Sequence, residues 1–111
     1  MKRIYIAGPL SSKTVPGYLS KVSTMLKIAK RVARMGYSPF IPCNDILLGI
    51  LDGHFAYEDF FQMSIAFLEV CDAIFVIDTS PGVLREIELA KKLNIPIFRS
   101  LKALAENLKK E

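Results

Sequence analysis

The fold is decided by residues 73–90, AIFVIDTSPGVLREIELA. The first part, Ala73–Ile77, is a short and continuously apolar run, which is typical of a strand buried on both faces of a parallel sheet. A Ser-Pro-Gly turn follows, and the periodic stretch after the turn predicts a helix over Val83–Leu93. Strand, turn and helix in this order form the repeating unit of a parallel α/β sheet.

The rest of the chain repeats this alternation. It predicts strands at Arg3–Ala7, Tyr37–Ile41, Ala73–Ile77 and Ile95–Phe98, and helices at Tyr18–Met35, Tyr57–Cys71, Val83–Leu93 and Leu101–Lys109. Residues 44–53 are apolar for a connection and predict a short helix or a packed loop. The pattern therefore predicts one α/β domain over residues 1–111, with a doubly wound parallel sheet of about four or five strands and helices on both faces.

The turn before the third helix has two interpretations. Backbone N–H groups at a helix start can hold phosphate, and Gly82 would let the backbone approach a ligand closely. Glu86 would then place a carboxylate about one turn further on. In the alternative, Ser80 is an N-cap, Pro81 is the first helical residue, and Glu86 is an early-helix acid suited to the helix dipole.

A second polar segment follows the first strand. The run Arg3–Ala7 stops at Gly8 and Pro9, and Ser11, Ser12 and Lys13 lie in the loop beyond. Ligands of parallel sheets collect outside the carboxyl ends of the strands, at the switch point of the strand order. Both polar segments are therefore expected to face one crevice. Tyr5 either points its phenol at that crevice or packs on a helix, as strand aromatics commonly do.

Together the two segments resemble the nucleoside 2-deoxyribosyltransferase-like superfamily. Its members begin with a Y-x-A-G-P-like strand, matched here by Tyr5–Pro9. They place the catalytic Glu four residues after a Gly in a D/S-x-G-x-x-x-E run, matched here by Ser80–Glu86. The resemblance extends over nearly the whole chain and implies a flavodoxin-like form of the doubly wound sheet.

The resemblance also implies a chemistry, the cleavage of the N-glycosidic bond between a base and a sugar. In this family a carboxylate attacks the anomeric carbon through an oxocarbenium-like transition state, as in retaining glycosidases. Glu86 matches the nucleophile, and Tyr5 matches the tyrosine that hydrogen-bonds and orients that carboxylate. Gly8 and the loop Pro9–Lys13 match the segment that wraps the sugar and its 5′ end. No metal and no cofactor are implied.

Ser80 bears on the substrate. The resemblance implies that members acting on nucleosides carry Asp at this position, facing the free 5′-hydroxyl, whereas members that hydrolyse nucleoside monophosphates carry Ser. A carboxylate would repel a phosphate, while a hydroxyl and helix N–H groups would hold it. Ser80, with Ser11, Ser12 and Lys13 as helpers and Gly82 beside it, therefore favours a nucleoside 5′-monophosphate.

One position departs from the family pattern. The family's hydrolases carry an Asp on the second helix that contacts the sugar and helps to protonate the departing base, and this position is Ser64 here. Asp59 is the candidate replacement, although it is equally an ordinary early-helix acid. Asp78, just after the third strand, is a second candidate for the missing acid. Asp72 is interpreted as a structural cap between the second helix and the third strand.

Composition narrows the other possibilities. The net charge is +4, and eight basic residues precede the first acidic residue, Asp45. This basic half of the chain either steers an anionic substrate toward the protein or is the solvated face of a helix. No nucleic-acid motif, membrane span or metal-type cysteine pair is recognisable, and a single His makes a zinc site unlikely. Two thiols and no export signal favour a cytoplasmic protein.

Other residues carry weaker expectations. His54 could contact a base, and Phe55, Tyr57 and Phe60 could stack on one, although such aromatics more often fill a core or an oligomer interface. The apolar segment 46–61 could bury a partner's surface. The resemblance implies a homodimer or a larger homo-oligomer with active sites near the subunit interfaces.

The sequence therefore predicts an enzyme that hydrolyses a (deoxy)nucleoside 5′-monophosphate through a covalent glycosyl-Glu86 intermediate. Two alternatives stay open: a non-catalytic nucleotide-binding module on the same fold, and a nucleoside deoxyribosyltransferase.

Overall fold

The computed structural model describes residues 1–10, 12–42 and 57–109 of the chain. Its centre is a four-stranded parallel sheet in the order β2-β1-β3-β4. The strands are β1 (Arg3–Ala7), β2 (Ser38–Phe40), β3 (Ala73–Val76) and β4 (Ile97–Phe98). The predicted parallel sheet is confirmed, and its order is that of the doubly wound, flavodoxin-like type.

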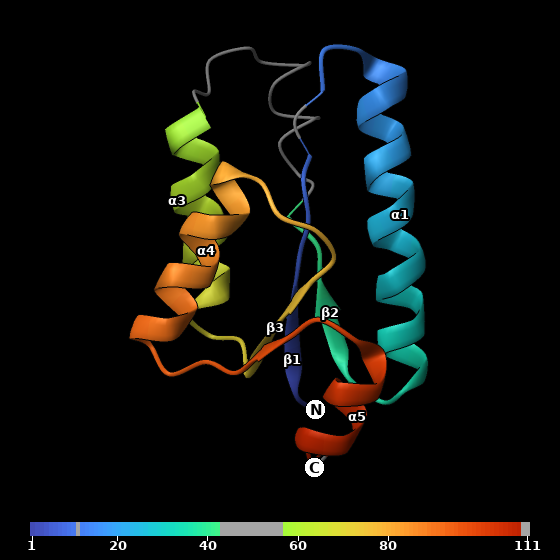
Figure 1. Cartoon of the computed structure of the whole chain (residues 1–111), viewed down its shortest axis with the longest axis vertical. Helices are drawn as coiled ribbons and strands as arrows, with labels where there is room; N and C mark the ends of the chain where they lie inside the picture. Colours follow the sequence, from blue (N-terminus) through green and yellow to red (C-terminus); the bar gives the residue numbers. More distant parts are fainter. Residues whose placement is uncertain (11, 43–56, 110–111) are drawn as a thin grey trace.

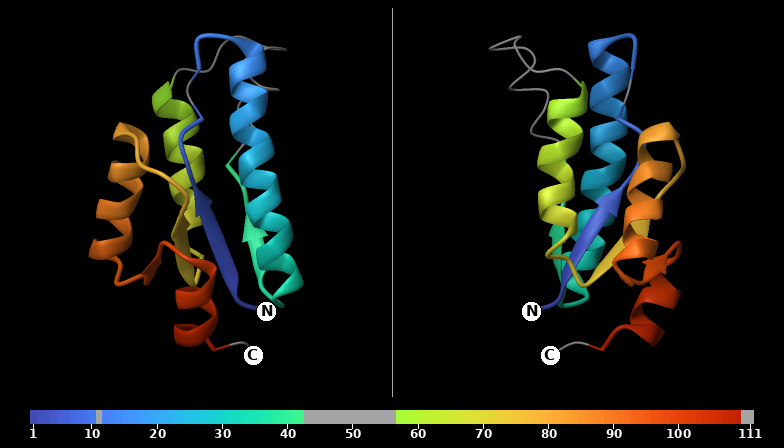
Figure 2. Two further views of the ribbon diagram at one scale, coloured as in Figure 1. Left: turned by 45° about the vertical axis from the view of Figure 1, so that its right-hand side comes forward. Right: turned by 90° about the vertical axis from the view of Figure 1, so that its left-hand side faces the viewer.

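Helices cover both faces of this sheet, as predicted (Figures 1 and 2). Helices α1 (Val15–Arg34) and α5 (Leu101–Asn107) pack on one face, and α3 (Tyr57–Leu68) and α4 (Pro81–Lys92) pack on the other. None of the helices in the described part of the chain is long and apolar enough to cross a membrane.

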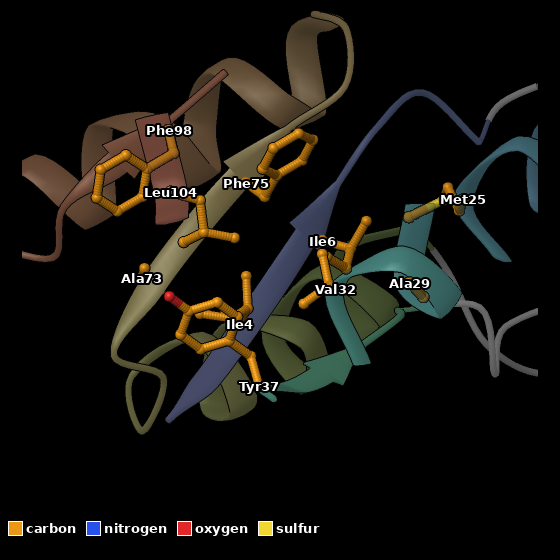
Figure 3. Packing of buried hydrophobic residues seen from close by; sticks show 10 residues of the cluster. All are labelled: Ile4, Ile6, Met25, Ala29, Val32, Tyr37, Ala73, Phe75, Phe98 and Leu104. Carbon is orange, nitrogen blue, oxygen red and sulfur yellow. The ribbon is translucent and has the colours of Figure 1, made fainter. Parts of the chain in front are cut away.

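Two apolar clusters hold the layers together because alternate strand residues point to opposite faces. Figure 3 shows the first cluster, in which Ile4 and Ile6 of β1 meet Met25 and Val32 of α1 and Leu104 of α5. The second cluster lies on the other face, where Tyr5 and Ala7 meet side chains of β3, α3 and α4. The residue between Ile4 and Ile6 therefore faces α3 and α4, and this residue is Tyr5.

Helices α1 and α4 begin two or three residues earlier than predicted, because an N-cap residue starts each of them. Helix α1 begins at Val15 and not at Tyr18, because the Thr14 hydroxyl accepts a hydrogen bond from the Gly17 N–H and starts the helix earlier. Helix α4 begins at Pro81 and not at Val83 for the same reason at Ser80. On α1, the side chains of Met25, Ala29 and Val32 are buried, whereas that of Leu26 is exposed.

The register of the two central strands positions the candidate site. Ala7 of β1 lies beside Val76 of β3, and the Ile77 N–H donates to the Ala7 carbonyl at 2.8 Å. The segments that follow these strands therefore start side by side at the carboxyl edge of the sheet. This edge between β1 and β3 is the switch point of the strand order, where ligands of such sheets bind.

Several predicted features lie outside the described residues. They are Ser11, Cys43, the apolar segment 44–53, His54 and Phe55.

Candidate active site

The candidate site is built around a buried hydrogen bond between Tyr5 and Glu86. Tyr5 is fully buried in the middle of β1, and its hydroxyl donates to Glu86 Oε2. Glu86 lies in the second turn of α4 and is only 8% exposed, which makes it the one buried charged side chain among the described residues. The two residues are far apart in sequence, and the packing of α4 over β1 brings them together.

The sequence of α4 explains why Glu86 is buried. Val83, Ile87 and Ala90 form the apolar stripe that packs on the sheet. Glu86 follows Val83 by three residues and precedes Ala90 by four, so it lies on the same stripe. A carboxylate therefore occupies a position where helix periodicity calls for an apolar side chain.

Burial sets the electrostatics of the pair. Desolvation raises the pKa of Glu86 to about 7 from an ordinary value of 4.5, and the hydrogen bond from Tyr5 lowers it in part. Burial first and the Glu86 charge second raise the pKa of Tyr5 far above its ordinary value. Tyr5 thus stays protonated and donates, while Glu86 changes charge close to neutral pH.

Ser64 lies beside this pair. A side-chain hydrogen bond with Ser64 lowers the pKa of Tyr5, against the two larger effects that raise it. Ser64 is partly buried on α3, between the buried residues Phe61 and Leu68 of that helix. The position at which the family pattern expects an Asp is therefore one that faces the Tyr5–Glu86 pair.

Arg85 fastens the two helices at this site, a contact that the sequence analysis missed. Its guanidinium binds both carboxylate oxygens of Glu58 on α3, at 2.9 and 3.1 Å. The same group lies 3.7 Å from the centre of the Phe61 ring, which makes a cation–π contact. The sequence shows that Arg85 is next to the candidate nucleophile. Its pairing with Glu58 could not be predicted, because the pairing depends on the angle at which α3 docks on α4.

At Ser80 the structure has the helix start that the sequence analysis gave as an alternative. The Ser80 hydroxyl accepts from the Val83 N–H at 3.2 Å, and Pro81 and Gly82 are the first residues of α4. Gly82 is thus part of the helix and not of the loop before it. The hydroxyl proton of Ser80 is a donor that the cap does not use, so capping and phosphate binding are compatible.

The loop after β1 is shaped by its own hydrogen bonds. The Ser12 hydroxyl accepts from the Thr14 N–H at 3.3 Å and lies over Gly17, where a Cβ would come within 2.3 Å of the Ser12 oxygen. A larger residue at position 17 would therefore require the exposed Ser12 side chain to shift. A Cβ at Gly8 would meet only ordinary contacts, so Gly8 is not required by sterics. Pro9 is partly buried, while Ser12 and Lys13 are exposed.

None of the other acids named from the sequence is buried with the pair. Asp59 is exposed on α3, about 140° around the helix from Ser64. Asp78 is exposed and accepts from the Thr79 N–H. Asp72 accepts from the Arg3 backbone N–H at 2.7 Å, which ties the start of β1 to the turn before β3 and fits the predicted structural role. Phe60 is partly buried, and its predicted stacking on a base stays a prediction.

Comparison with known families places most of the chain in one family. A family model described as a domain of unknown function, DUF4406, matches residues 2–99. The chain belongs to this family. None of the curated proteins matches it in sequence.

Two solved structures share the fold of this DUF4406 protein. One is a 2-deoxyribosyltransferase from Bacillus psychrosaccharolyticus, with 20% identity and a TM-score of 0.62 over 86% of this chain and 69% of that one. The other is a 2-deoxyribosyltransferase from Leishmania mexicana, with 20% identity and a TM-score of 0.64 over 87% of this chain and 62% of that one. The predicted resemblance is confirmed at the level of the fold.

The sequence predicts that Glu86 is a surface-accessible helix position that tolerates Ala, and this prediction is wrong because the side chain is buried. Replacing it by Ala would leave the buried Tyr5 hydroxyl without its acceptor, which costs roughly 1–3 kcal/mol. Gln keeps an acceptor oxygen and the side-chain volume, so it is the better variant for separating chemistry from folding.

We predict that Glu86→Gln stabilises the protein above neutral pH. The folded state raises the pKa of Glu86 from 4.5 to about 7, so ionisation destabilises the fold progressively as the pH rises through this range. Gln carries no charge and escapes this loss. The midpoint of thermal unfolding should therefore be several degrees higher than that of the wild type at pH 8, with a smaller difference at pH 4.5.

The matched control is Glu88→Gln, because Glu88 is an exposed acid on the same helix. Its unfolding midpoint should follow that of the wild type at both pH values. A Glu86→Gln advantage that does not grow with pH would contradict the proposed cost of burying the carboxylate.

Proposed function

We propose that the protein hydrolyses the N-glycosidic bond of a (deoxy)nucleoside 5′-monophosphate, with Glu86 as the nucleophile. The observation that carries the proposal is the buried Tyr5–Glu86 hydrogen bond. This hydrogen bond lies on the face of the sheet that α4 covers, at β1 and β3, the two strands between which the strand order switches. The fold is shared with two 2-deoxyribosyltransferases, whose names point to the same class of bond.

The proposed reaction has two steps. The Glu86 carboxylate attacks the anomeric carbon, the C–N bond breaks, and its electron pair leaves with the base. Water then attacks the anomeric carbon of the glycosyl-Glu86 intermediate and restores the carboxylate, while the base gains a proton. Tyr5 binds Oε2, which leaves Oε1 to attack, and the ionised fraction of Glu86 rises as the pH passes about 7.

Two other functions remain as candidates. The hydrolases of the nucleoside 2-deoxyribosyltransferase-like superfamily carry an Asp where this chain has Ser64, and the absence of this acid favours a nucleotide-binding module without catalysis. The two named 2-deoxyribosyltransferases favour transfer of the sugar to a second base in place of water. Incubation with a panel of nucleotides and nucleosides, with and without a second base, separates the three when free base and new nucleosides are followed by chromatography.

We predict that Glu86→Gln abolishes base release from every substrate on this panel, because an amide is a poor nucleophile. Circular dichroism should show an intact fold, since the Tyr5 hydroxyl keeps an acceptor. Glu88→Gln is the matched control and should retain wild-type turnover. Base release by Glu86→Gln at the wild-type rate would exclude the covalent mechanism, and nucleotide binding without base release by the wild type would support the binding module.

We predict that Ser80→Asp weakens the use of monophosphates at least tenfold, which corresponds to about 1.4 kcal/mol. Asp caps helices as well as Ser does, so α4 should still begin at Pro81. The added carboxylate should repel the phosphate and affect nucleosides less. Steady-state kinetics on a matched nucleoside and monophosphate tests this, and an equal loss on both would limit Ser80 to its capping role.

The proton donor for the departing base is tested with two variants. If Asp59 serves as the acid, Asp59→Asn should lower turnover by roughly 10²–10⁴, the usual contribution of general acid catalysis. Ser64→Asp should raise turnover, because position 64 faces the Tyr5–Glu86 pair. Rates of base release decide between the sites. A silent Asp59→Asn together with a Ser64→Asp that adds nothing would remove both positions from protonation of the base.

A further inference from the structure

Helix α1 exposes a face that combines apolar and basic side chains. Figures 1 and 2 show this helix along one side of the molecule, with α3 and α4 on the other side of the sheet. Six exposed side chains of α1 form what is called the outer α1 face below, namely Val15, Leu19, Leu26, Lys27, Lys30 and Arg34. At about 100° per residue, all six lie within about 120° of arc around the helix axis.

The apolar members of this face are not needed for the core. Val15 is 55%, Leu19 52% and Leu26 51% exposed, and none of the three belongs to either apolar cluster. A single exposed leucine is ordinary on a protein surface. These three side chains instead form a row about 16 Å long on one side of the helix. Such a row can enter an apolar environment as a unit.

The basic members of the face are not compensated within the protein. Helix α1 has five basic residues and no acidic one. Lys27, Lys30 and Arg34 form no ion pair with any residue that the structure describes. Basic residues in a last helical turn suit the helix dipole, which accounts for Arg34, but Lys27 and Lys30 lie before that turn. Their charges are therefore available to a partner.

Charge is also divided between the two faces of the sheet. On the opposite face, α3 and α4 together carry four acidic and three basic residues. Three of these acids, Glu58, Asp59 and Glu88, are exposed. A molecule with this distribution turns its basic side toward an extended anionic surface. The long-range attraction and the apolar row therefore favour contact through the same helix.

We propose that the outer α1 face docks on the surface of an anionic phospholipid bilayer, with α1 parallel to the membrane plane. Val15, Leu19 and Leu26 enter the headgroup region. Lys27, Lys30 and Arg34 bind lipid phosphates, while their aliphatic stems lie along the apolar row. The contact is peripheral, because α1 lies at the interface and does not cross it.

The shape and the chemistry of the face favour a bilayer over other anionic partners. A helix of 20 residues is about 30 Å long and presents a convex surface, whereas helical peptides bind in apolar grooves. Proteins that bind single-stranded nucleic acid combine basic residues with aromatic side chains for stacking. The outer α1 face has no aromatic member and has three aliphatic ones. Leucines beside lysines are instead typical of helices that lie at a membrane interface.

Helix α3 provides a comparison within the molecule. Its side chains Met63 and Phe67 are also exposed, at 39% and 47%. However, α3 carries Glu58 and Asp59 and no basic residue. An anionic bilayer would repel these two charges, so the exposed side chains of α3 and α4 are not expected to contact the membrane.

Co-sedimentation with lipid vesicles tests the proposal. The wild type should bind vesicles made of equal parts of phosphatidylcholine and phosphatidylglycerol, and should not bind vesicles of phosphatidylcholine alone. Binding should fall as the NaCl concentration rises from about 50 to about 300 mM, because salt screens the attraction.

Two double variants locate the charges that bind lipid. Lys27→Glu with Lys30→Glu should lower the partition coefficient by about tenfold or more, because each cation near an anionic membrane contributes to binding. Lys91→Glu with Lys92→Glu is the matched control, since it changes the net charge equally through exposed residues of α4. The control should lower the coefficient by less than about twofold.

A third double variant tests the apolar row. Leu19→Ser with Leu26→Ser should lower the partition coefficient by about fivefold or more, because binding of an interfacial helix scales with its buried apolar area. Leu84→Ser on α4 is the control, with a native exposure of 53%, and should bind as the wild type does. Circular dichroism should show that all these variants are folded, since every substituted side chain is exposed.

Three outcomes would overturn the proposal. They are a wild type that does not bind the anionic vesicles, an equal loss of binding in the Lys91 and Lys92 control, and undiminished binding by the Leu19 and Leu26 variant. Fluorescence anisotropy with a short labelled DNA duplex covers the alternative partner. Binding to the duplex that anionic vesicles do not compete away would assign the face to nucleic acid instead. None of these outcomes depends on enzymatic activity.

Discussion

The buried hydrogen bond between Tyr5 and Glu86 constrains the rest of this structure. Taking a carboxylate out of water costs several kcal/mol, and a single phenol O–H returns only part of it. The pKa of Glu86 is raised because the hydrogen bond from Tyr5 does not offset this desolvation in full. Apolar packing on both sides of the pair has to carry this cost, and α4 supplies it through Val83, Ile87 and Ala90.

Holding the pair also requires a fixed distance between the helix layer and the sheet. Arg85 contributes by binding Glu58 and covering Phe61, which fastens α3 to α4 next to Glu86. Exposed ion pairs of this kind usually contribute little to stability. Two hydrogen bonds and a ring contact on one guanidinium nevertheless restrict the direction in which α3 can move. The contact therefore matters more for the position of Ser64 relative to Tyr5 than for the free energy of unfolding.

The fold was predicted well from the sequence because strands and helices are recognised from the pattern of apolar residues within each short segment. Apolar strands that alternate with amphipathic helices fix the parallel sheet, and the segments after β1 and β3, which carry Gly8 and Ser80, start at its carboxyl edge. The partnership of Tyr5 with Glu86 came from the family resemblance and not from periodicity. Burial of Glu86 was missed because a Glu in the second turn of a helix also suits the helix dipole. The contacts of Arg85 depend on how α3 docks on α4. The spacing of residues within one helix does not predict this docking.

Helix α3 connects three parts of the molecule. Glu58 and Phe61 contact α4, Ser64 faces Tyr5, and Phe67 continues through Phe40 to the Tyr5 ring. These contacts lie before, at and after Ser64 along a helix of twelve residues. The reach of the Ser64 hydroxyl to Tyr5 therefore depends on how α3 docks both on α4 and on β2.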